Sequence, residues 1–150
     1  IFPFLSIFLA ILAIIGFRRL TKTKVEIKKS VRHVKTKSGE FALKINIFLR
    51  AKKDVENLAL IEKVPAIVKI YNKFGATKPD KIDPESRRLR WNVGDLNSGE
   101  ERIFSYIVYS KIGVIGKFSL PESKAVFESD GKIQETHSNI VHFMSDQVKR

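Results

Sequence analysis

The sequence predicts an all-β domain, an antiparallel sandwich of seven or eight strands, that follows one apolar N-terminal helix. Three observations lead to this prediction: an uncharged apolar run over Ile1–Phe17, an apolar/polar alternation of period two along most of the chain after Lys24, and turn residues at short spacing. About 130 residues beyond the apolar run are enough for one hydrophobic core. The chain has no cysteine, so disulfides and thiolate chemistry are excluded.

The apolar run Ile1–Phe17 is predicted to be a transmembrane helix. Seventeen residues at a rise of 1.5 Å give roughly 25 Å, the short end of a membrane span. Pro3 suits the first turn of a helix, where its missing N–H has no partner to lose. A signal-peptide core is less favoured, because the basic residues follow the run instead of preceding it. A buried core helix is less favoured, because the rest of the chain offers no helical partner.

Residues 18–24 are expected to form a basic juxtamembrane linker. Its Arg18, Arg19, Lys22 and Lys24 are predicted to face lipid headgroups, which long basic side chains can reach from a helix end. The net charge of +12 also suggests an anionic partner, either lipid headgroups or nucleic acid. The excess is densest over residues 18–37, with nine basic residues and one acid.

The strongest strand signal is the run of residues 41–49, where Phe41, Leu43, Ile45, Ile47 and Leu49 alternate with other residues. The strand before it is expected to pair with it antiparallel through Ser38-Gly39. A run of residues 102–109 is apolar on both faces and is predicted to be a central strand buried on both sides. Further strands are expected over Leu58–Val64, Ile67–Tyr71, residues 89–93, Val114–Leu120, Ala125–Glu128 and Ile133–Phe143.

Turn signals divide these strands. The longest irregular stretch is expected over Asn72–Glu85, and Asp130-Gly131 predicts a tight hairpin. The sandwich is assigned to residues 25–143 and a polar tail to residues 144–150.

Several short sequence segments occur in a characteristic order between residues 25 and 143. They are Glu62-Lys63-Val64-Pro65, the corner from Leu89 to Glu100 with Trp91, Gly94 and Gly99, the strand Ser105–Tyr109, Leu120-Pro121, Ala125-Val126-Phe127, and Ser138-Asn139. Together they resemble the conserved-repeat immunoglobulin-like domains of archaeal envelope proteins. The resemblance covers about four-fifths of the chain and implies an immunoglobulin-like spacer or assembly domain. It assigns structural roles to Trp91 in the core, to Gly94 and Gly99 in turns, and to Pro121 at a strand end.

No residue pattern predicts catalysis, a cofactor or a metal. His137 and His142 differ by an odd number, so on one strand they would point to opposite faces. Asp80, Asp83 and Glu85 cluster in one predicted loop, but basic residues surround them and the EF-hand spacing is absent. No G-x-S-x-G motif occurs. The chain is therefore predicted not to be an enzyme and to have no small-molecule substrate.

The predicted function is a membrane-anchored structural or interaction module of a cell envelope. Its expected partners are membrane lipid, other proteins and neighbouring domains of a longer chain. The alternative is a basic, membrane-tethered nucleic-acid-binding domain. The basic residues after Phe17 favour a cytoplasmic domain by the positive-inside rule, with an extracellular domain as the alternative that the resemblance implies.

Overall fold

A computed structural model describes residues 3–20, 24–35, 41–75, 77–110 and 116–145. Within these residues it contains one helix and eleven strands, all antiparallel to their neighbours. They are α1 (Pro3–Leu20), β1 (Val25–Lys35), β2 (Phe41–Ala51), β3 (Val55–Lys63), β4 (Lys69–Phe74), β5 (Lys81–Asp83), β6 (Arg88–Leu96), β7 (Glu101–Ser110), β8 (Gly116–Leu120), β9 (Lys124–Ser129), β10 (Lys132–His137) and β11 (Val141–Ser145).

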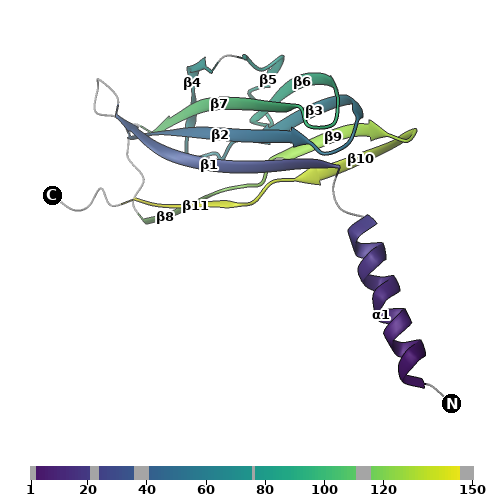
Figure 1. Cartoon of the computed structure of the whole chain (residues 1–150). Helices are drawn as coiled ribbons and strands as arrows, with labels where there is room; N and C mark the ends of the chain where they lie inside the picture. Colours follow the sequence, from purple (N-terminus) through teal and green to yellow (C-terminus); the bar gives the residue numbers. More distant parts are fainter. Residues whose placement is uncertain (1–2, 21–23, 36–40, 76, 111–115, 146–150) are drawn as a thin grey trace.

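The strands form two facing sheets and a short ribbon (Figure 1). One sheet has the order β1-β2-β7-β4, and the other has the order β10-β9-β3-β6-β5. The ribbon pairs β11 with β8, and both β10 and β11 contact β1. The chain is therefore an all-β sandwich, as the alternation predicts.

The core lies between the two sheets and follows from the period-two pattern. In β2 the residues Leu43, Ile45, Ile47 and Leu49 are fully buried, because every second side chain of a strand points to the same face. The other sheet contributes a buried set that includes Leu58, Leu60, Leu89, Trp91 and Phe127. One continuous apolar cluster joins both inner faces.

The hairpin predictions are confirmed where the structure describes them. β1 and β2 pair along their whole length, although Ser38 and Gly39 lie outside the described residues. Asp130 and Gly131 join β9 to β10 with φ values of 53° and 72°, the left-handed conformations of a tight two-residue turn.

Several details of the strand prediction are wrong. The structure describes eleven strands instead of seven or eight, and one of the extra strands, β5, lies inside the predicted loop Asn72–Glu85. The predicted closing strand Ile133–Phe143 is two strands, β10 and β11, which pair with different neighbours. In β7 the outer face is only partly buried: Ile103 is 64% exposed, Ile107 and Tyr109 are half-buried, and Ser105 is buried, so this strand is not fully buried on both sides.

The N-terminal helix forms, but with other bounds. α1 covers Pro3–Leu20, so it continues past Phe17 into the first three residues of the expected linker. Its large apolar side chains between Phe4 and Leu12 are exposed by 48% to 84%. Figure 1 shows α1 standing clear of both sheets. In the described part of the chain, no helix has both the length and the apolarity needed to cross a membrane.

Candidate functional site

Lys24, directly before β1, is bound to the far end of the chain sequence. Its Nζ lies 2.8 Å from Asp130 Oδ2 and 2.9 Å from Ser129 Oγ, at the tip of the β9–β10 hairpin. Lys24 was expected to face lipid, but its side chain is only 18% exposed and binds its own domain. Of the other three predicted lipid-facing residues, Lys22 lies outside the described residues, and the side chains of Arg18 and Arg19 are not described.

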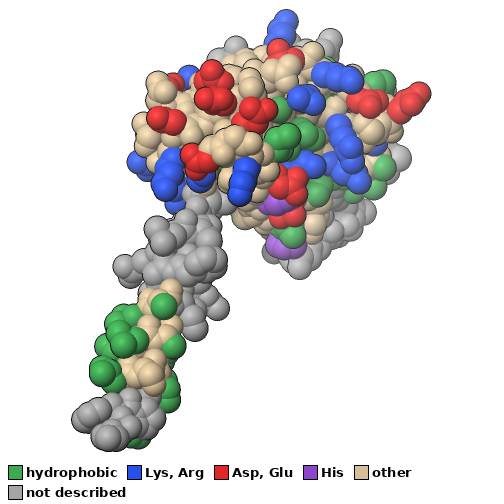
Figure 2. Space-filling model, turned by 90° about the vertical axis from the view of Figure 1, so that its right-hand side faces the viewer, with side chains coloured by type: hydrophobic (Ala, Val, Ile, Leu, Met, Phe, Trp, Pro, Cys, Tyr) green, Lys and Arg blue, Asp and Glu red, His purple; other side chains and the backbone are tan. Residues whose placement is uncertain are grey.

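The end of the sandwich next to α1 carries acidic side chains. Asp54, Glu56, Glu128 and Asp130 line a hollow of about 320 Å³ there. Figure 2 looks toward this end and shows acidic groups gathered on it above the departing helix. Most of these acids have partners: Asp54 accepts from the Ser98 amide, and Asp130 pairs with Lys24. No group of described His, Asp or Glu residues has an arrangement that could hold a metal ion.

A second charged cluster lies in the core. Lys29 of β1 and Glu62 of β3 form an ion pair across the two sheets, with 2.7 Å between Nζ and Oε2, and both side chains are 0% exposed. Tyr106 donates its hydroxyl to Glu62 Oε2 at 2.7 Å, and Ser123 donates to Oε1 at 3.1 Å. Lys29 Nζ also donates to the carbonyl of Pro121 at 2.7 Å. Among the described residues, every buried side-chain nitrogen or oxygen has a hydrogen-bond partner.

Burial controls the protonation of this cluster. Loss of hydration raises the pKa of Glu62, and the Lys29 charge and the hydrogen bonds offset part of that rise. The same loss of hydration lowers the pKa of Lys29, against the attraction of Glu62. Burial and the nearby Glu62 carboxylate raise the pKa of Tyr106, which keeps its hydroxyl protonated as a donor. The cluster is closed to ligands and connects the two sheets.

The backbone of Lys29 is held by Asn139, which precedes β11. The Asn139 Oδ1 accepts from the Lys29 N–H at 2.9 Å, and its Nδ2 donates to the Lys29 carbonyl at 3.0 Å. A carboxamide has the same donor and acceptor as a peptide group. Asn139 therefore satisfies a stretch of the open edge of β1, as a neighbouring strand would.

The four residues with predicted structural roles all lie at special positions. Trp91 is 1% exposed, contacts Phe104 and Tyr106, and donates from Nε1 to the Thr77 carbonyl at 3.2 Å. Gly94 and Gly99 have φ values of 87° and 90°, where a side chain would strain the backbone. Gly99 lies in a turn as predicted, but Gly94 lies within β6, where the register with β3 shifts, so the predicted turn at Gly94 is wrong. Pro121 directly follows β8 and accepts from Lys29.

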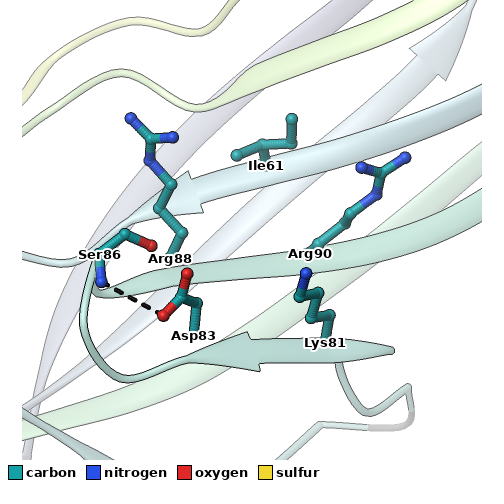
Figure 3. A pocket seen from close by; sticks show the side chains of 6 residues that line it. All are labelled: Ile61, Lys81, Asp83, Ser86, Arg88 and Arg90. Carbon is teal, nitrogen blue, oxygen red and sulfur yellow. Dashed lines mark hydrogen bonds between the residues drawn. The ribbon is translucent and has the colours of Figure 1, made fainter.

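An open pocket on the outer face of the five-stranded sheet is the clearest candidate binding site. It has a volume of about 200 Å³ and is lined by Ile61, Lys81, Asp83, Ser86, Arg88 and Arg90, from β3, β5, β6 and the β5–β6 turn. Figure 3 shows the Arg88 and Arg90 side chains rising on either side of Ile61, with Lys81 and Asp83 on the edge strand. The pocket is therefore shallow, basic and accessible.

The cations of this pocket form no ion pair with a described carboxylate, although Asp83 lies opposite Arg88 on the adjacent strand and the charge of Lys81 contributes to the lowering of the Asp83 pKa. Among the described residues, no carboxylate forms an ion pair with Lys81, Arg88 or Arg90. Asp83 is already used: its Oδ1 accepts from the amides of Glu85 and Ser86, and the hydrogen bonds from Ser86 lead the lowering of its pKa. Arg90 donates a hydrogen bond from Nε to Asn92 Oδ1. The remaining guanidinium and ammonium donors face solvent.

The other residues weighed for chemistry are dispersed. Asp80 caps the Asn92 amide at 2.6 Å and Asp83 closes a turn, so these acids have backbone partners. His137 lies beside Glu122 and Glu135 on β10, whereas His142 lies on β11, so the assumption that they share one strand is wrong. His142 Nδ1 is 2.8 Å from Ser119 Oγ, a pair that the sequence analysis missed. Among the described residues, no carboxylate orients the second nitrogen of that ring.

The buried cluster was missed too, although the sequence contains a signal for it. Lys29 occupies the apolar phase of Val25, Ile27 and Val31, and Glu62 occupies that of Leu58, Leu60 and Val64. A charged residue at a core position of each of two strands indicates a buried pair, because an isolated buried charge is too costly.

Comparisons with known proteins show the fold and no more. No family model matches this chain, and no curated protein matches its sequence. The GH20 exo-β-N-acetylglucosaminidase of Vibrio harveyi, in an inactive mutant form, aligns with 78% of this chain at 13% identity and a TM-score of 0.51. The full-length major pilin SpaD of Corynebacterium diphtheriae aligns with 79% at 13% identity and a TM-score of 0.51. The chain covers only 18% and 35% of those two proteins.

Proposed function

We propose that this chain is a membrane-anchored, non-enzymatic interaction module whose sandwich is of the immunoglobulin-like kind. The observation that carries the proposal is the exposure of α1. From Phe4 to Ala13 its only polar side chain is Ser6, and seven large apolar side chains lie open on a helix clear of the sheets. Apolar surface in water is unfavourable by about 25 cal/mol per Å², and a helix that is apolar all round belongs in an apolar environment.

The sandwich supports a presenting role. Its buried Lys29 and Glu62 form an ion pair that is closed to solvent, which suits a rigid spacer between the membrane and a partner. Its outer face holds the accessible basic pocket. The module would hold this surface at a fixed place near the membrane, for protein partners or for neighbouring domains of the same longer chain.

Vesicle flotation tests the anchor. The full chain should float with neutral phosphatidylcholine vesicles and remain bound in high salt, because apolar insertion is not screened by ions. Ile7→Lys combined with Ile11→Lys should abolish flotation, since it puts two charges into lipid. The matched control Ile103→Lys combined with Ile133→Lys adds the same charge at exposed strand positions and should float normally. Release of the unmodified chain by salt alone would overturn the proposal.

The sandwich is placed on the cytoplasmic side in this proposal. The nine basic residues between Arg18 and Lys37 support it, since moving each charge against a membrane potential takes about 2.3 kcal/mol per 100 mV. A tag after Arg150 should survive protease treatment of intact cells and disappear after lysis. Loss of the tag without lysis would place the domain outside, the alternative that the family resemblance implies.

A basic nucleic-acid-binding domain is the second candidate function. The unpaired cations of the pocket favour it, because phosphate neutralisation drives such binding. The described tyrosines offer no stacking platform beside them: Tyr71 and Tyr109 lie on β4 and β7 of the other sheet and contact each other edge to face.

A further inference from the structure

In the basic pocket, like charges lie opposite each other on adjacent strands, which is unfavourable when no anion is bound. Lys81 of β5 lies directly opposite Arg90 of β6, and Lys63 of β3 lies directly opposite Arg88. Like charges in directly opposed cross-strand positions destabilise a sheet. Arg88 also has Asp83 opposite it on β5, but the Oδ1 of that carboxylate already accepts from the amides of Glu85 and Ser86. The face therefore holds four cations against one carboxylate, and a bound anion would relieve the remaining repulsion.

The neighbouring Arg87 has a structural role, and its contacts differ from those of Arg88 and Arg90. Its guanidinium donates to the carbonyls of Val64, Pro65 and Val68 and is half-buried. Arg88 and Arg90 make no such contacts to backbone carbonyls among the described residues, and both are exposed. Two arginines on one face, two residues apart, start from Cα positions about 7 Å from each other, and each carries a planar five-donor group. Such groups bind phosphate oxygens in pairs.

We propose that the pocket between Lys81, Arg88 and Arg90 binds phosphate groups of a linear polyanion, and that it recognises charge and not bases. Among the described residues that line it, Ile61 is the only apolar one and none carries an aromatic ring. A multiply charged phosphate suits three cations around one pocket better than a single carboxylate does. A phosphate chain also extends naturally from the Lys81–Arg90 row to the Lys63–Arg88 row.

The position of the pocket indicates that its ligand is not the lipid around α1. The chain enters the sandwich at Lys24, whose carbonyl accepts from the Lys52 amide just before β3. Ile61 lies six residues further along β3 than Val55, which is about 20 Å at the rise of a strand. The field of a charged membrane falls within a Debye length of about 8 Å. The near end carries Asp54, Glu56, Glu128 and Asp130, and Lys24, Lys53 and Lys132 contribute to the lowering of the Asp130 pKa there. The conclusion that the pocket lies away from the membrane rests on the proposed function, whereas the proposal that the pocket binds phosphate does not.

The test uses the full chain in neutral detergent micelles, where insertion into a bilayer plays no part. The probe is a short inorganic polyphosphate, and its affinity is measured by calorimetry over a series of salt concentrations. Arg88→Gln combined with Arg90→Gln should lower the affinity at least about tenfold and reduce the salt slope by roughly two, one for each lost phosphate contact. Arg32→Gln combined with Arg50→Gln removes the same charge from the exposed outer positions of β1 and β2 and should change the affinity less than about twofold.

Two further probes separate the sources of the anion. Polyglutamate of equal charge should bind clearly more weakly than polyphosphate, and oligothymidylate with the same number of phosphates should bind about equally. Equal losses in both double variants would reduce the effect to net charge and overturn the proposal. Equal binding of polyglutamate would overturn the preference for phosphate, and much tighter binding of oligothymidylate would assign the surface to nucleic acid. Failure of vesicle flotation would leave all of these results unchanged.

Discussion

The sandwich contains two groups of charged side chains: one is buried and forms an ion pair, and the other is exposed and consists mainly of cations. Lys29 and Glu62 lie between the sheets, fully buried, with every donor and acceptor satisfied. Lys81, Arg88 and Arg90 lie on the outer face, where Lys81 opposes Arg90 and no described carboxylate forms an ion pair with them, although Asp83 lies opposite Arg88. Buried charges must be compensated within the fold, whereas exposed charges are screened by water and remain free for a ligand. The first group therefore determines stability, and the second is available for binding.

The largest expected effect comes from breaking the inner pair. Lys29→Met should lower the free energy of unfolding by about 3–5 kcal/mol, because it leaves the Glu62 carboxylate buried without a cation. Chemical denaturation followed by tryptophan fluorescence would measure it. The control Lys28→Met removes a neighbouring lysine whose side chain is 71% exposed, and should stay within about 0.5 kcal/mol. A small loss for Lys29→Met would show that the pair is hydrated.

A smaller effect is expected at the edge of the same cluster. Asn139→Ala removes both hydrogen bonds to the Lys29 backbone and should destabilise the domain by roughly 1–3 kcal/mol. Amide hydrogen exchange at Lys29 should accelerate more than exchange within the β2–β7 ladder, because the substitution reopens only the edge of β1. Unchanged protection at Lys29 would mean that another group covers this edge.

The pH dependence of stability should distinguish buried from exposed carboxylates. In the native state the pKa of Glu62 lies above its ordinary value of 4.5. At a pH between 4.5 and this raised pKa, the native state binds a proton that the unfolded state lacks. Stability from Glu62 therefore rises as the pH falls through this window, by at most about 1.4 kcal/mol per pH unit.

Glu62→Gln should remove this contribution, so denaturation curves at several pH values should diverge from those of the unmodified chain toward acid. Asp130 supplies the contrast. Lys24 lowers the pKa of Asp130 below 3.8, so its contribution is present above that value and is lost as the pH falls through the lowered pKa. Parallel pH profiles for Glu62→Gln and the unmodified chain would contradict the assignment.

The smallest expected effect belongs to the outer group. Arg88→Gln combined with Arg90→Gln should change the free energy of unfolding by less than about 0.5 kcal/mol, and a slight increase is expected because cross-strand repulsion is relieved. Thermal unfolding at low and high salt would measure it. A loss of several kcal/mol would show that these arginines stabilise the fold, which would contradict the division between the two groups.

Sequence reasoning reached the fold class through local pattern. The alternation around Ile45 and Ile47 and the Asp130-Gly131 turn each depend on a few neighbouring residues, so they could be interpreted without tertiary information. The short edge strand β5 and the division of the last strand were missed. β5 exists because its backbone pairs with β6, and its three residues have no periodicity of their own.

The charged residues show where local information ends. Lys24 follows directly after an apolar segment and therefore predicts a lipid contact, yet its partner is Asp130, which is 106 residues away. Arg88 and Arg90 alternate with the buried Leu89 and Trp91, so their position on one face follows from the period of two. Their cationic neighbours Lys63 and Lys81 could be assigned only when the strand order was known.

By itself, the sequence determined an apolar helix, a β-rich domain and a strong excess of positive charge, because these follow from composition and from a period of two. Only the tertiary structure decided which charges neutralise each other. Lys29 finds Glu62 across the sheets, while Lys81 and Arg90 meet as like charges on adjacent strands. The physical reason is that electrostatic energy depends on distance and hydration, and both are set by strand order and register instead of by separation along the chain.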